Sequence, residues 1–245
     1  MGFSIILPTF NENNHIKDLI NSISEIFLTQ NILFEILVVD DNSTDGTRET
    51  VDEFAKISEY VKIINRNNKK KNLAKSIDEG IKKTYYNYII WMDADFQHPP
   101  KYLSEFIKLS KKYDAIVCSR FLAESKRYFS DENINKKINE NQSYVYNKLC
   151  NFFLFKDLTD YTSGFICLKK DLLKNYSLRG YYGDYFVNLM VYFKRNGVKI
   201  LEIPFQDGLR ASGFSKTVVK INFRYFCLCL RYLLALVKNI FFRFF

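Results

Sequence analysis

Short apolar runs alternate with amphipathic segments through the first half of the chain. The runs are rich in Ile, Leu, Val and Phe, whereas the segments between them place apolar residues every three or four positions, which is typical of helices packed on one side. The expected strands are 3–8, 34–39, 61–64 and 88–92, and the expected helices are 12–27, 47–57 and 73–83. This alternation predicts an α/β fold with a mostly parallel central sheet covered on both faces.

The second half of the chain has a less regular pattern. The expected strands are 115–120, 164–168 and 198–203, and the expected helices are 143–155 and 186–196. Residues 122–142 are polar, rich in Lys, Asn and Glu, and nearly free of branched aliphatic residues. We expect this stretch to be a mobile surface segment that closes over a ligand beside Arg120.

Residues 217–245 combine basic and apolar side chains in one helical pattern. Lys220, Arg224, Arg231 and Lys238 fall close to heptad spacing and share one face, and nearly all other positions are aromatic or aliphatic. Arg231 would lie in the middle of a membrane-spanning helix, at a cost of about 2.5–3.5 kcal/mol. We therefore expect an amphipathic helix that lies in a membrane interface. The alternatives are a helix packed on the protein's own core or on a second subunit.

The composition favours an anionic partner. The chain of 245 residues has a formal net charge of +9 and a pI near 9.1, which suits a nucleotide, a phospholipid surface or nucleic acid. No nucleic-acid-binding motif is present, so we expect no nucleic-acid partner. The five cysteines lack metal-ligand spacing, and the count is odd with no N-terminal signal peptide, so we expect reduced thiols in the cytosol.

Two carboxylates follow the apolar run 88–92 where we expect a strand to end. Asp93 and Asp95 are two positions apart, so strand alternation points them to the same side. Like charges so close repel unless a cation or proton lies between them, and a hard divalent ion with oxygen ligands is the best match. The alternative is an ordinary turn, in which Asp is common and which would include His98 as a turn residue.

Other polar or turn-forming residues also fall at predicted strand ends. Ligands of parallel α/β sheets bind at the carboxyl ends of the strands. The residues at or just beyond those ends are Pro8, Asp40, Asp41, Arg66, Asp93 and Asp95. Their coincidence predicts a single site for an anion and a metal ion.

Six motifs in order give the chain a family resemblance over about residues 3–216. They are Leu7-Pro8-Thr9-Phe10-Asn11-Glu12, the stretch from Val38 to Thr47, the stretch from Asp93 to Pro100, Ser119-Arg120-Phe121, the stretch from Asp160 to Phe165, and the stretch from Arg210 to Lys216. With these motifs the chain resembles family 2 glycosyltransferases, in particular their dolichyl-phosphate mannose synthase-like branch, which acts on polyprenyl phosphates. Relatives usually have Gly-Leu-Gly where this chain has Asn72-Leu73-Ala74.

The resemblance implies an architecture and a reaction. Residues 1–216 would form a glycosyltransferase A-type nucleotide-binding fold, with a nucleotide-sugar-binding half at 1–115 and an acceptor half at 116–216, followed by the amphipathic helix 217–245. The implied reaction transfers a sugar from a GDP- or UDP-linked donor to a polyprenyl phosphate, with Mg²⁺ or Mn²⁺ and with inversion at the anomeric carbon. It would take place at the cytoplasmic face of a membrane.

The resemblance also implies roles for individual residues. Pro8, Phe10, Glu12 and either Asp40 or Asp41 would hold the base and ribose. Asp93, Ala94, Asp95 and Gln97 would contact the donor diphosphate and the metal ion, with Asp93, Asp95 and Gln97 as metal ligands. The catalytic residues would be Asp95, Arg120, Arg210 and Lys216, the basic ones facing the donor diphosphate or the acceptor phosphate.

Structural roles are the alternative for several of these residues. Glu12 could cap the start of a helix, one of Asp40 and Asp41 could form a turn, and Arg120 could pair with a structural carboxylate. Arg210 and Lys216 could be solvated loop charges.

The acceptor chemistry leaves two further functional alternatives. A phosphate acceptor is already ionised at neutral pH, whereas a hydroxyl acceptor needs a carboxylate close to the attacking oxygen. The second half lacks the Glu-Asp pair that hydroxyl-acceptor relatives usually carry. The first alternative is transfer to a hydroxyl of a cell-surface glycan, with Asp160 or Asp184 as the base, and the second is a non-catalytic nucleotide-sugar-binding membrane scaffold.

Overall fold

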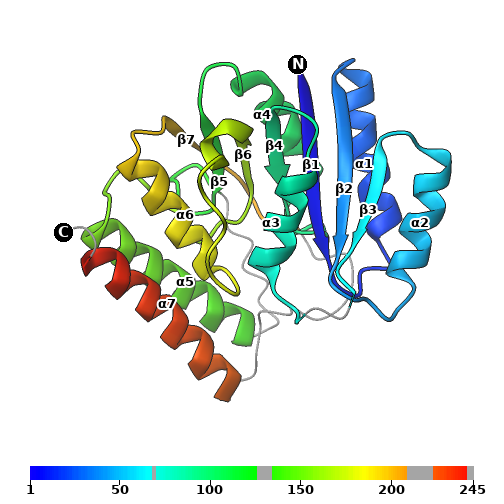
Figure 1. The fold of residues 1–245 in the computed structure, drawn as a ribbon. Helices are drawn as coiled ribbons and strands as arrows, with labels where there is room; N and C mark the ends of the chain where they lie inside the picture. The colour runs from blue at the N-terminus through cyan, green and yellow to red at the C-terminus, as the bar shows by residue number, and fades with distance from the viewer. Residues whose placement is uncertain (68–69, 126–133, 209–222, 242–245) are drawn as a thin grey trace.

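The computed structural model describes residues 1–67, 70–125, 134–208 and 223–241 of the chain (Figure 1), and it describes side chains in these ranges except in 134–141 and 223–229. The predicted site residues Arg210 and Lys216 and the predicted surface cation Lys220 therefore lie outside the described residues. The side chain of Arg224 does as well.

The described strands form one seven-stranded sheet in the order β3-β2-β1-β4-β6-β5-β7. The strands are β1 (Gly2–Thr9), β2 (Leu33–Asp40), β3 (Val61–Asn65), β4 (Tyr88–Trp91), β5 (Ala115–Ser119), β6 (Ile166–Lys169) and β7 (Ile200–Pro204). Pairings are parallel except for those of β6, which runs antiparallel to both β4 and β5. The prediction of a mostly parallel sheet is confirmed.

Helices cover both faces of this sheet (Figure 1). The helices are α1 (Ile16–Thr29), α2 (Thr47–Ile57), α3 (Leu73–Lys83), α4 (Leu103–Leu109), α5 (Ile134–Phe153), α6 (Asp184–Arg195) and α7 (Phe223–Phe241), with short 3-10 helices η1 (Pro100–Tyr102) and η2 (Lys170–Leu173). The predicted bounds of α2 and α3 are confirmed.

Two hydrophobic cores lie on opposite faces of the sheet because strand side chains alternate between the faces. Ile5 and Leu7 of β1 point into the core shared with α1 and α4, and Ile6 points into the core shared with α3, α5 and α6. Trp91, the last residue of β4, is buried in this second core. Every strand next to the proposed site is therefore fixed from both sides.

Strand register brings the predicted site segments to one edge of the sheet. Thr9 at the end of β1 pairs with Asp40 at the end of β2, and Ile6 pairs with Trp91 at the end of β4. The segments that follow β1, β2 and β4 therefore leave the sheet at the same edge, as expected for a ligand site of a parallel sheet.

Two sequence predictions are corrected by the backbone. We expected β1 to stop at Pro8, but it continues to Thr9. The pairing of β1 with β4 ends at Ile6, whose carbonyl accepts a hydrogen bond from Met92 just beyond β4. Pro8 lies beyond this pairing, so its missing N–H costs no hydrogen bond to β4. We also expected residues 122–142 to be a mobile surface segment, but residues 134–142 belong to α5, and residues 126–133 lie outside the described residues. Lys, Glu and Gln are good helix formers, and they offset the scarcity of apolar residues there.

The C-terminal helix α7 packs against α6 and α5 (Figure 1). Leu236 and Asn239 are buried, Asn239 Nδ2 donates to Asn188 Oδ1 at 2.9 Å, and the hydroxyl of Tyr146 on α5 donates to the carbonyl of Tyr232 at 2.8 Å. One face of α7 thus packs on the protein's own core, as one of our alternatives predicted.

None of the described helices is long and apolar enough to cross a membrane.

Candidate functional site

The acidic loop, which we define as residues 93–98, follows β4 directly. Asp95 is buried, Ala94 is buried, and Asp93 and Gln97 are half-buried. The backbone N–H of Gln97 donates to Asp95 Oδ1 at 3.0 Å, which closes the turn. The loop therefore concentrates two carboxylates and one amide at the carboxyl edge of the sheet.

The donor set of the acidic loop fits a hard divalent cation. The ligands on offer are all oxygen atoms: the carboxylates of Asp93 and Asp95 and the amide oxygen of Gln97. Oxygen ligands suit Mg²⁺ or Mn²⁺ rather than a softer metal. Within the described ranges, no three His, Cys, Asp or Glu side chains come together as a complete metal cage. An ion bound here would complete its shell with phosphate oxygens and water, which is the usual arrangement where Mg²⁺ holds a nucleotide.

His98 is buried, contrary to our expectation of an ordinary turn residue. Its ring stacks on Phe165 with 4.8 Å between centroids and an interplanar angle of 7°. Burial lowers the pKa of His98 to about 4, although the negative charges of Asp207 and Asp95 act to raise it. The ring is therefore neutral at physiological pH. We missed this role because the sequence shows only a polar residue before two prolines.

The two aspartates after β2 have different structural roles. Asp40 is fully buried and accepts hydrogen bonds from the backbone N–H of Ser43 at 2.9 Å and from the hydroxyl of Thr9 at 3.3 Å. It also accepts one from the hydroxyl of Ser43. Asp40 is therefore the turn-forming residue of the pair, one of the alternatives left open by the sequence.

Asp41 forms an ion pair with Arg66 at the edge of the predicted base site. Arg66 Nη1 lies 2.6 Å from Asp41 Oδ1, and the backbone N–H of Asn72 donates to Asp41 Oδ2 at 2.8 Å. Arg66 also contacts Glu79 at 3.1 Å and is only 1% exposed. Arg66 therefore orients Asp41 instead of facing a ligand, contrary to the strand-end pattern in the sequence.

Asn72 accounts for a departure from the family pattern. Its side chain accepts a hydrogen bond from the backbone N–H of Lys75 at 2.9 Å and so caps the start of α3. Its φ of −164° is extended backbone, which needs no glycine. The glycine of relatives is thus replaced here by a capping residue that also binds Asp41 through its own backbone N–H.

The residues after β1 contact the loop that follows β2. The backbone N–H of Glu12 donates to Thr47 Oγ1 at 2.8 Å, and Glu12 Oε2 lies 2.9 Å from His15 Nε2. Its carbonyl accepts from Ile16 N, the first residue of α1. Glu12 thus supports the helix start through its backbone carbonyl, whereas its side chain contacts His15 and does not cap the helix. The ring of Phe10 is half-buried, and the ammonium of Lys71 lies over it, 3.2 Å from the ring centroid.

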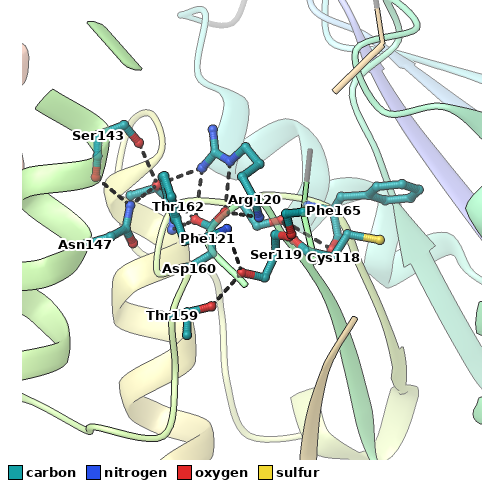
Figure 2. Close-up of polar contacts among 12 residues, drawn as sticks. Cys118, Ser119, Arg120, Phe121, Ser143, Asn147, Thr159, Asp160, Thr162 and Phe165 are labelled. Carbon is teal, nitrogen blue, oxygen red and sulfur yellow. Dashed lines mark hydrogen bonds and ion pairs between the residues drawn. The ribbon is translucent and has the colours of Figure 1, made fainter. Parts of the chain in front are cut away.

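Arg120 and Asp160 form the most extensively bonded ion pair near the site (Figure 2). Arg120 Nε donates to Asp160 Oδ2 at 2.8 Å, and Nη2 donates to Oδ1 at 2.9 Å. Burial acts to lower the pKa of Arg120, but the Asp160 carboxylate outweighs it and raises the pKa. The alternative in which Arg120 pairs with a structural carboxylate thus describes its main contact.

Neighbouring residues fix both members of this pair. Arg120 Nη2 also donates to Thr162 Oγ1 at 2.9 Å, and Thr162 Oγ1 accepts from Asn147 Nδ2 of α5 at 2.8 Å (Figure 2). Glu202 of β7 accepts from the backbone N–H of Asp160 at 2.9 Å. The end of β5 is thereby connected to α5 and β7 through side chains that the sequence did not single out.

Asp160 and Asp184, the two base candidates for a hydroxyl acceptor, both have structural partners. Asp160 is 1% exposed and accepts five hydrogen bonds from Arg120 and Thr162. Asp184 accepts from the backbone N–H of Tyr182 at 2.8 Å and of Tyr181 at 3.0 Å. Both carboxylates are therefore engaged by hydrogen bonds from neighbouring residues.

A family model, Glycosyl transferase family 2, matches residues 4–177. A dolichol-phosphate mannosyltransferase of Pyrococcus furiosus is 30% identical over 240 residues, which cover 97% of this chain and 64% of the relative. The chain therefore spans less than two thirds of that relative's length. A dolichol-phosphate mannosyltransferase of Mycosarcoma maydis is 28% identical over 91% of this chain and 76% of its own length.

Solved structures share the fold at low sequence identity. A glucosyl-3-phosphoglycerate synthase from Mycobacterium tuberculosis, crystallised with Mn²⁺, UDP and phosphoglyceric acid, aligns over 98% of this chain and 78% of its own with a TM-score of 0.66 and 16% identity. A mannosyl-3-phosphoglycerate synthase from Rubrobacter xylanophilus aligns over 98% and 73% with a TM-score of 0.68 and 13% identity. The α/β fold is that of these two synthases. The family model matches well over half of the chain, so the chain belongs to glycosyl transferase family 2.

Proposed function

We propose that the protein transfers a hexose from a GDP- or UDP-linked sugar to a polyprenyl phosphate, with inversion at the anomeric carbon. In this reaction an acceptor phosphate oxygen forms a bond to the anomeric carbon while the bond from that carbon to the donor diphosphate breaks. The bonding electron pair leaves with the nucleoside diphosphate, so one displacement inverts the configuration.

The hydrogen bonds that occupy the carboxylate of Asp160 are the observation that favours a phosphate acceptor. A hydroxyl acceptor must lose its proton to a nearby base, whereas a phosphate is already ionised at neutral pH. Asp160 is fully engaged with Arg120 and Thr162, and Asp184 holds the backbone before α6. The similarity to two dolichol-phosphate mannosyltransferases supports the same class of acceptor.

The acidic loop would hold the donor diphosphate through a divalent ion. Asp93, Asp95 and Gln97 would ligate Mg²⁺ or Mn²⁺, which neutralises the negative charge that develops on the leaving diphosphate. We further infer that Asp41, oriented by Arg66 and Asn72, contacts the base or ribose beside Pro8, Phe10 and Glu12. Arg210 and Lys216 would supply positive charge to either phosphate.

An exposed apolar face supports a location at a membrane surface, which we propose to be the cytoplasmic one. This two-helix apolar face consists of Tyr144, Val145, Leu149, Phe152 and Phe153 on α5 and of Leu230, Leu233, Leu234, Val237 and Phe241 on α7. The two helices run side by side (Figure 1), and the rings of Tyr146 and Tyr232 lie 4.9 Å apart between them. A contiguous face of this kind typically binds another protein or a membrane.

The charges around this face favour anionic lipid over a second copy of the chain. Lys148, Arg231 and Lys238 are exposed beside the apolar residues, and neither 141–156 nor 209–245 contains an acidic residue. Two copies facing each other would bring like charges together, whereas lipid phosphates attract them. Arg231 also stacks over Tyr181 at 4.4 Å, so it lies at the α6 edge of the face.

A donor panel tests the proposed function. Purified protein with Mn²⁺ would be given GDP- and UDP-linked hexoses and one of three acceptors: a polyprenyl phosphate, the matched polyprenol, or 3-phosphoglycerate. We expect release of nucleoside diphosphate only with the polyprenyl phosphate. Turnover with the polyprenol would overturn the phosphate acceptor, and turnover with 3-phosphoglycerate would replace the lipid by a small phosphate.

A further inference from the structure

The imidazole of His98 reaches back to the first residue of its own loop. The backbone N–H of Asp93 donates to His98 Nδ1 at 2.9 Å. This bond requires an unprotonated Nδ1, so the neutral ring carries its proton on Nε2. The ring is held in place by stacking on Phe165 and by an edge contact with Phe205, whose centroid is 5.9 Å away. His98 is thus a fixed acceptor for the backbone of Asp93.

A second backbone contact holds the other side of the same loop. After β7, the backbone N–H of Gly208 donates to the carbonyl of Gln97 at 2.9 Å. The approach is close enough that a Cβ on Gly208 would lie 2.1 Å from the carbonyl oxygen of Phe96. Only glycine fits there without movement of the loop.

The backbone between these two contacts has an unfavourable conformation. Phe96 has a φ of +65°, in the left-handed region that aromatic residues rarely adopt. Such a conformation persists only where the surroundings enforce it, and it is common at ligand-binding sites. His98 on one side and Gly208 on the other are the contacts that can enforce it.

We infer that His98 is a positioning residue that fixes the backbone of Asp93, and with Gly208 fixes the acidic loop, in the geometry that binds the metal–diphosphate group. This inference rests on the proposed function. His98 would not ligate the metal, because its Nδ1 accepts from the backbone of Asp93 and its protonated Nε2 has no lone pair to offer a cation. Residues that orient metal ligands in this way typically change metal affinity by about 10- to 100-fold when they are replaced.

A matched pair of variants separates the acceptor atom from the ring. In His98→Asn the side-chain Oδ1 takes the place of Nδ1 and keeps the acceptor but loses the ring. In His98→Phe the ring keeps its packing on Phe165 and loses the acceptor. Binding of Mn²⁺ in the presence of UDP, and separately of GDP, would be measured by titration calorimetry and by the Mn²⁺ electron paramagnetic resonance signal, with thermal unfolding to confirm that each variant is folded.

We expect His98→Phe to weaken Mn²⁺ binding by about tenfold or more and His98→Asn to bind more tightly than His98→Phe. Gly208→Ala, which acts from the other side of the loop, should also weaken Mn²⁺ binding. Equal affinity of wild type and His98→Phe would overturn the inference, and so would equal losses in the two His98 variants. If wild type binds no Mn²⁺ with either nucleotide, the proposed function itself fails.

Discussion

The guanidinium of Arg120 and the carboxylate of Asp160 are joined by two parallel hydrogen bonds of 2.8 and 2.9 Å (Figure 2). The pair connects the end of β5 to the motif that precedes β6, and its bidentate geometry is the strongest form of such a contact. Because Asp160 is 1% exposed, its charge is stabilised almost entirely by Arg120 and by backbone donors.

This pairing predicts strong coupling between the two residues. Arg120→Leu leaves the buried Asp160 carboxylate without its cation, so we expect the free energy of unfolding to fall by about 3 kcal/mol. Asp160→Leu should have a similar effect. The double variant should lose much less than the sum of the two, as measured by urea denaturation. Additive losses would contradict the pairing.

The metal-dependent step predicts the effect of Asp95→Asn. The substitution keeps the size of the side chain and can still accept from the Gln97 N–H, but it removes a negative charge that the metal needs. Turnover should fall by about 10²-fold or more. EDTA should abolish turnover in the wild type, and Mn²⁺ or Mg²⁺ should restore it. Full activity in EDTA would exclude this role for the acidic loop.

The two-helix apolar face predicts binding to anionic vesicles. Phe152 and Leu234 are 68% and 57% exposed, so replacing both with Glu should leave the fold intact, remove apolar burial and add repulsion. We expect the double variant to lose flotation with vesicles that contain anionic lipid.

Ile57→Glu on α2 is a matched control for this experiment. Ile57 is 83% exposed and is the last residue of α2, a helix on the opposite side of the molecule from α5 and α7 (Figure 1). The Ile57→Glu variant should float with anionic vesicles like the wild type. If the Phe152/Leu234 variant still floats, the face does not bind the membrane; a wild-type dimer that this variant converts to a monomer would assign the face to a second copy instead.

The lowered pKa of Glu35 predicts that the free energy of unfolding falls at acid pH. Burial acts to raise its pKa, but hydrogen bonds from Lys62, Ser4 and the Tyr85 backbone outweigh burial and lower the pKa below its usual 4.5. The unfolded chain therefore takes up the proton first, and the stabilisation by Glu35 is present above pH 4.5 and is lost below it. Glu35→Gln should show a shallower loss of stability in this range; an unchanged acid slope would contradict this account.

The sequence predicted the first half of the fold well because its strands and helices follow simple periodicities. The bounds of α2 and α3 required only the spacing of apolar residues. In contrast, the antiparallel direction of β6 depends on contacts with β4 and β5, which no local pattern reveals. The acidic loop was located because Asp93 and Asp95 coincide with other polar residues at predicted strand ends; the two aspartates alone would also fit an ordinary turn.

The sequence did not reveal which partners the polar residues would choose. Arg66 and Arg120 both looked like candidates for binding phosphate, yet each pairs with an aspartate from another segment, Asp41 and Asp160. Pairings of this kind depend on strand order rather than on sequence spacing. Gly208 was missed for the same reason, because its contact with Gln97 joins two segments far apart in the sequence. The burial of His98 was missed because it depends on packing against Phe165 and Phe205.

The most direct test of the proposed reaction is the mass of its lipid product together with the nucleotide released. The protein would be incubated with Mn²⁺, a polyprenyl phosphate and each GDP- or UDP-linked hexose, and both products would be identified by mass spectrometry. We predict one hexose on a polyprenyl monophosphate and an equal amount of nucleoside diphosphate. A diphosphate-linked lipid with nucleoside monophosphate, or no lipid product with any donor, would contradict sugar transfer to a lipid phosphate.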